Sequence, residues 1–91
     1  MLNLRAEAVS KEIQEFSQHL RALKGELQER GRLSETTRTL LNQIQQHKER
    51  LEAKFSNAER AGSWDSIKSE FAEDWNSLVI EVSALENRLY E

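Results

Sequence analysis

The sequence predicts an all-α protein, an antiparallel up-down-up three-helix bundle with coiled-coil-like heptad packing. The 91-residue chain contains no proline, so long helices are permitted throughout, and glycine occurs only at Gly25, Gly31 and Gly62. Apolar residues form heptad-like stripes, with most steps of three or four, in three consecutive segments. The last two glycines lie about one helix length apart, where helix C-terminal caps are expected. The predicted helices of this single domain, 1–91, cover about 3–30, 34–61 and 63–90.

The first predicted helix carries an uninterrupted apolar stripe. Its members are Leu2, Ala6, Val9, Ile13, Phe16, Leu20, Leu23 and Leu27. This spacing keeps one edge of a helix against a partner helix along its whole length. Gly25 lies off the stripe, and Gly31 can adopt the left-handed conformation that ends a helix near Arg30.

The second and third helices each follow a glycine and a serine that can act as an N-cap, Ser34 for the second and Ser63 for the third. The second stripe has a polar gap at His47 or Lys48, and its apolar members are Leu40, Leu41, Ile44, Leu51, Phe55 and Ala58. The third stripe, widened by Val79 and Tyr90, consists of Trp64, Ile67, Phe71, Trp75, Leu78, Val82, Leu85 and Leu89.

Helices of equal length with very short connections favour the antiparallel bundle. The alternative is a long helical hairpin that dimerises, which requires one helix to continue through a glycine, most easily Gly62. Antiparallel pairing about the two turns predicts a layer at mid-height that contains Phe16, His47 and Trp75. A polar residue in that layer could specify the register of the helices.

Charge is distributed unevenly along the chain. Residues 1–32 hold six basic and five acidic residues, residues 33–62 hold five and four, and residues 63–91 hold two and seven. The acidic third helix is therefore expected to pair with the mildly basic first and second helices. A net charge of −3, with basic residues interspersed by glutamate, argues against nucleic acid as a ligand.

Catalytic and metal-binding groups are weakly represented. Ser17, His47 and Asp74 have the atoms of a catalytic triad, but all three project from helices, where interior N–H groups cannot form an oxyanion hole. No HxxxH or ExxH pair occurs on one helix face, and the chain has no cysteine. We therefore expect no enzymatic activity, metal or cofactor. His47 is expected to be a partly buried ring between aromatic neighbours, and His19 to be exposed.

The two tryptophans are eleven residues apart, so they share one face of the third helix with Ile67 and Phe71. One interpretation is that this face fills the core. The functional interpretation is a partner-binding surface formed by Trp64, Ile67, Phe71 and Trp75, because aromatic residues dominate binding hot spots. Trp64 is the better candidate for exposure, since it lies in the first turn at the end of the bundle.

The segments 63–68, SWDSIK, and 74–78, DWNSL, resemble the C-terminal helix of small, charged, stress-associated coiled-coil proteins of bacteria. The resemblance covers about a third of the chain and implies a non-enzymatic helical protein. This sequence has fewer alanines and lysines in its first two helices than that family.

The sequence therefore predicts a non-enzymatic helical interaction or scaffold protein that associates with itself or with a partner helix. The alternative is an amphipathic protein of the membrane surface. No apolar run approaches the length of a transmembrane segment, and the start of the sequence does not resemble a secretory signal, so a cytoplasmic location is expected.

Overall fold

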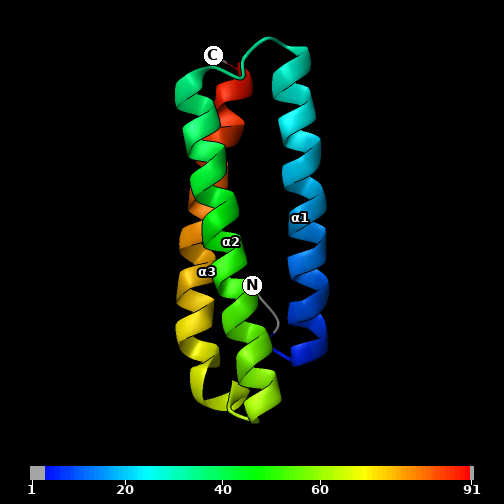
Figure 1. Ribbon diagram of the computed structural model, residues 1–91, viewed down its shortest axis with the longest axis vertical. Coiled ribbons are helices and arrows are strands. Elements are labelled where there is room, and N and C mark those ends of the chain that lie inside the picture. Colours follow the sequence, from blue (N-terminus) through cyan, green and yellow to red (C-terminus); the bar gives the residue numbers. More distant parts are fainter. Residues whose placement is uncertain (1–3, 91) are drawn as a thin grey trace.

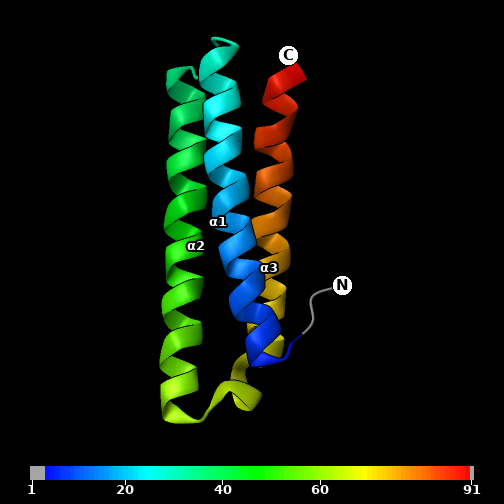
Figure 2. The ribbon, with the colours of Figure 1, turned by 90° about the vertical axis from the view of Figure 1, so that its right-hand side faces the viewer.

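Three long helices follow one another along the chain (Figure 1). The computed structural model describes residues 4–90, in which α1 spans Ala6–Glu29, α2 spans Glu35–Ala61, α3 spans Trp64–Asn87, and a short 3-10 helix, η1, spans Arg88–Tyr90. Figure 2 shows that α2 runs antiparallel to both α1 and α3. The bundle is elongated, measuring 45 × 20 × 19 Å. The predicted all-α three-helix bundle is confirmed.

The two glycines that divide the sequence end α1 and α2. Gly31 and Gly62 have φ angles of 66° and 69°, in the left-handed region that favours glycine. At the end of α2 the backbone N–H of Ser63 donates to the carbonyl of Ala58 at 2.8 Å, and an equivalent bond closes α1. The alternative of a long hairpin does not hold in this structure, because neither glycine continues a helix.

The two predicted serine caps differ. Ser34 accepts a hydrogen bond from the backbone N–H of Thr37 at 3.2 Å, so this N-cap is confirmed. The prediction for Ser63 is wrong, because its side chain makes no cap hydrogen bond. With ψ near 14°, its backbone lacks the extended conformation of an N-cap, and instead its carbonyl accepts from the N–H of Ser66 at 3.0 Å.

The helices are shorter than predicted. α1 begins at Ala6, since Arg5 has extended backbone angles and Leu4 precedes it outside the helix. The expected first stripe position, Leu2, lies outside the described residues. At the other end, α3 gives way to the 3-10 turn of η1 after Asn87.

The three predicted stripes form the core. The buried apolar residues are Val9, Ile13, Leu20, Leu23, Leu27, Leu41, Ile44, Leu51, Phe55, Ala58, Trp64, Phe71, Trp75, Leu78, Val82, Leu85 and Leu89. Val79 and Tyr90, which were expected to widen the third stripe, are instead 44% and 81% exposed. Each follows a buried leucine that already occupies the core position, and one residue along a helix turns the side chain by about 100°.

The mid-height layer is partly as predicted. The rings of Phe16 and Trp75 lie 5.2 Å apart between centroids, which confirms their contact. His47 is partly buried, as predicted, and its Nδ1 lies 3.1 Å from the carboxylate of Glu81.

All three phenylalanines and both tryptophans form one continuous aromatic column. Starting from Phe16 and Trp75, it continues to Phe71 at 6.0 Å, to Trp64 at a further 5.2 Å, and to Phe55 at 4.9 Å. Since these rings come from all three helices, the column joins the middle of the bundle to the end at which α2 turns into α3.

Truncation of Trp75 tests this packing. Trp75→Ala should lower the free energy of unfolding by roughly 3–5 kcal/mol, because it removes a side chain that is only 6% exposed and contacts two other rings. Urea unfolding would measure the loss. Ile80→Ala on the same helix is the control, since a side chain that is 71% exposed should contribute less than about 0.5 kcal/mol. A loss below about 1 kcal/mol for Trp75→Ala would contradict the packing described here.

Candidate functional site

The aromatic residues that were candidates for partner binding lie in the core. Trp64 is 8% exposed, Phe71 is fully buried and Trp75 is 6% exposed, while Ile67 is partly buried against the core. The structure brings these four residues together on one face of α3, as their spacing predicts, but that face points inward. The interpretation that the face fills the core therefore describes this structure, and the aromatic side chains are not available as an exposed docking surface.

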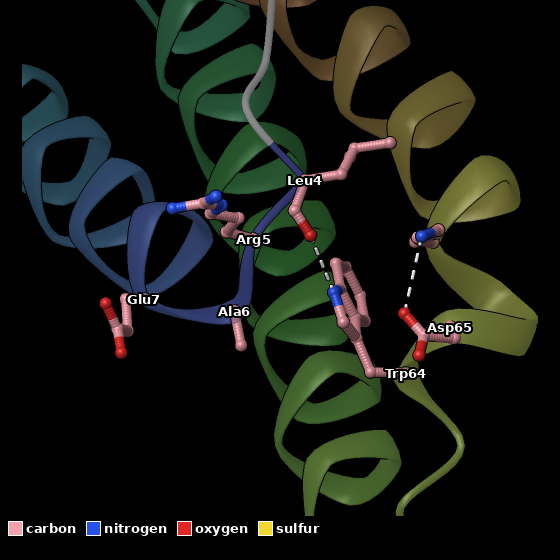
Figure 3. Close-up of a pocket in the computed structure, with 7 residues that line it drawn as sticks. Leu4, Arg5, Ala6, Glu7, Trp64 and Asp65 are labelled. Atoms are coloured by element: carbon pink, nitrogen blue, oxygen red, sulfur yellow. Dashed lines mark hydrogen bonds and ion pairs between the residues drawn. The ribbon is translucent and has the colours of Figure 1, made fainter.

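Trp64 is covered although it lies at the end of the bundle. Its indole Nε1–H donates to the carbonyl of Leu4 at 2.8 Å, and Figure 3 shows the ring under the segment that leads into α1. Phe55 packs edge-on against its other side. Trp64, the better candidate for exposure, is therefore buried, because a contact between residues 60 positions apart closes the end of the bundle.

A depression of about 510 Å³ lies beside this contact. It is lined by Leu4, Arg5, Ala6, Glu7, Trp64, Asp65 and Lys68. Lys68 pairs with Asp65 at 3.3 Å across its edge, and the Asp65 side chain is 91% exposed. An open hollow with self-paired charges and no buried polar group aimed into it offers little to hold a specific small ligand.

The groups weighed for catalysis have separate partners. Ser17 Oγ donates to the carbonyl of Ile13 at 3.1 Å and accepts from Lys48 Nζ at 3.1 Å. His47 pairs with Glu81, whereas Asp74 lies 3.9 Å from Lys54. The structure thus does not bring the three groups together. Within residues 4–90, no group of three or more His, Asp or Glu side chains could hold a metal ion.

Four acidic side chains of α3 contact its two neighbours. Lys54 of α2 contacts Glu70 at 2.6 Å and Asp74 at 3.9 Å. Higher in the bundle, His47 of α2 pairs with Glu81, and His19 of α1 pairs with Glu86 at 2.9 Å. The ring of His19 is exposed, as expected. This arrangement confirms the predicted pairing of the acidic helix with the other two.

The remaining outer surface of α3 is uncharged over its C-terminal half. Between residues 76 and 90, the exposed residues are Asn76, Ser77, Val79, Ile80, Ser83, Ala84, Asn87 and Tyr90. We call these eight residues the neutral face. The charged residues of the same span, Glu81, Glu86 and Arg88, are all partly buried beside it. In a chain with 32% charged residues, an uncharged surface of four helical turns is unusual.

The neutral face also carries the exposed large hydrophobic residues of the described chain. These are Val79, Ile80 and Tyr90, at 44%, 71% and 81% exposure. Sequence reasoning missed the site because it assigned Val79 and Tyr90 to the core and did not consider Ile80. One signal was present, since Asn76, Ile80, Ser83 and Asn87 repeat the steps of four and three without a charge.

Comparison of the chain with protein-family models, curated proteins and solved structures finds no match.

The ion pairs of Lys54 between α2 and α3 predict that the stability of the fold depends on pH in the alkaline range. The hydrogen bond to Glu70 raises the pKa of Lys54 above its ordinary 10.5, the charges of Glu70 and Asp74 add to this, and partial burial opposes it. A pKa raised by folding means that the stabilisation is fully present below pH 10.5 and is lost as the pH rises through the folded-state pKa.

Lys54→Arg and Lys54→Met test this dependence. Arginine keeps its charge at these pH values, so Lys54→Arg should become more stable relative to wild type as the pH rises above 10.5. Lys54→Met should be less stable than wild type near neutral pH and should approach it in the same alkaline range. Urea unfolding at a series of pH values would measure both differences. Two differences that do not change with pH would contradict the role of Lys54.

Proposed function

We propose that this chain is a non-enzymatic helical interaction protein that docks another helix on the neutral face of α3. The observation that carries the proposal is that Val79, Ile80 and Tyr90 are exposed together among uncharged residues, with Glu81 and Glu86 only at the borders. Interface centres are depleted in charged residues and enriched in tyrosine, as this face is. Burying Ile80 and its apolar neighbours would favour association, and no ion has to leave water for it.

The shape and charge of the rest of the molecule support an interaction role. The two connections are short, and the apolar stripes of the three helices are used in the core. Glu70, Glu81 and Glu86 of α3 are paired within the chain. The resemblance to stress-associated coiled-coil proteins and the cytoplasmic location are parts of the same proposal.

The membrane-surface alternative has less support. Interfacial helices present a wide apolar face bordered by Lys and Arg, whereas α3 is bordered by Glu81 and Glu86. Among residues 4–90, no helix combines the length and apolar character needed to cross a bilayer.

Site-specific photo-crosslinking in the cells that produce the protein would test the proposal. A benzophenone side chain in place of Ile80 should form cross-linked species with a protein partner. The same group in place of Gln18, which is exposed on α1, is the matched control and should form few. Equal cross-linking at both positions, or none at position 80, would count against the neutral face.

Ile80→Glu provides a second test. With the photoreactive group moved to Tyr90, Ile80→Glu should reduce cross-linking at least about tenfold, which corresponds to roughly 1.4 kcal/mol of binding free energy. The variant should still fold, because the substituted side chain is 71% exposed, and its circular dichroism and melting temperature would verify this. An unchanged cross-linking yield in a folded variant would exclude Ile80 from the interface.

A further inference from the structure

We infer that the helix docked on the neutral face is α3 of a second copy of this chain, and that the two helices run antiparallel. This inference rests on the proposed function and names its partner. The proposed dimer joins two neutral faces about a two-fold axis near residues 80–83. Each face comprises Asn76, Ser77, Val79, Ile80, Ser83, Ala84, Asn87 and Tyr90.

Charge complementarity selects a second copy over a charged partner. A charged helix laid on the neutral face would place its charged side chains over Ile80 and other uncharged residues, while Glu81 and Glu86 at the borders each already contact a histidine. At the centre of the contact such a helix would therefore lose hydration without gaining an opposite charge. The eight residues of an identical face bring no charge to the centre of the contact, and they offer the exposed Ile80 an apolar neighbour.

The placement of charge along α3 selects the antiparallel direction. The acidic residues that precede the neutral face, including Glu73, occupy the N-terminal half of the helix. Parallel pairing would lay Glu73 beside the Glu73 of the other copy, and like charges in contact oppose association. Antiparallel pairing about the neutral face moves the two acidic halves to opposite ends of the dimer and opposes the two helix dipoles.

The small side chains of the neutral face allow two such helices to approach closely. Ile80 is flanked by the short side chains of Ser77, Ser83 and Ala84, so that the Ile80 of one copy can enter the hollow beside the Ile80 of the other. The face is about 22 Å long, at 1.5 Å per residue. A standard interface buries roughly 800 Å² per partner, and because a single pair of helices meets along this short face, we expect a weak, reversible dimer.

Cysteine cross-linking of the purified full chain tests both the partner and the direction. The chain has no cysteine, so each introduced thiol is unique. Asn76→Cys and Asn87→Cys place exposed thiols three turns, or about 16 Å, apart along one face, too far for both to meet one partner position. When the two variants are mixed and oxidised, the 76–87 disulfide should exceed each self-disulfide at least about fivefold.

Two controls complete the experiment. Gln18→Cys on α1 should form no dimer under the same conditions, and Ile80→Glu added to both cysteine variants should abolish the 76–87 disulfide. In sedimentation equilibrium, the mass of the wild type should rise above 10.6 kDa with concentration, whereas Ile80→Glu should stay monomeric.

Three results would overturn the inference. Predominant 76–76 and 87–87 disulfides would show a parallel pair, and cross-linking as strong from Gln18→Cys would show a contact that is not specific. A wild type that stays monomeric at millimolar concentration would exclude self-association. If position 80 nevertheless cross-links to a different protein in cells, the proposed function survives and only the second copy as partner is wrong; if it cross-links to nothing, both fail.

Discussion

The aromatic column is the contact on which the rest of the bundle depends. Phe16 comes from α1, Phe55 from α2, and Trp64, Phe71 and Trp75 from α3. Contacts among these rings hold the three helices together and fix how far each is displaced along its neighbours. A 91-residue chain without disulfides has few other ways to define a single arrangement. Offset and edge-on ring contacts are directional as well as apolar, which makes a slip of one helical turn costly.

With the rings facing inward, several acidic side chains of α3 lie beside the neighbouring helices. Glu70 and Asp74 reach Lys54, Glu81 reaches His47, and these contacts draw the acidic groups toward the neighbouring helices. The outer surface that remains over residues 76–90 is neutral. The candidate interface is thus a product of the same packing that builds the core, rather than a separate addition to it.

Repetition along the chain made the helices, their order and most of the core predictable from the sequence. Gly31 and Gly62 were recognisable as helix ends because left-handed backbone favours glycine, and the contact of Phe16 with Trp75 followed from counting residues away from the turns. What could not be predicted depends on contacts distant in sequence. The cover of Trp64 by Leu4 has no local signal, and Ile80 became notable only once the inward face of α3 was known.

The aromatic column occupies only one half of the bundle. Beyond Trp75 the core of α3 is aliphatic, with Leu78, Val82 and Leu85, and the helix ends in a 3-10 turn. Local opening is easiest where fewer large contacts hold the helices, so backbone amides near the C-terminus should exchange with solvent before those beside the rings. The neutral face lies on this half of α3. A helix bound there would therefore reduce local opening where it is expected to be easiest.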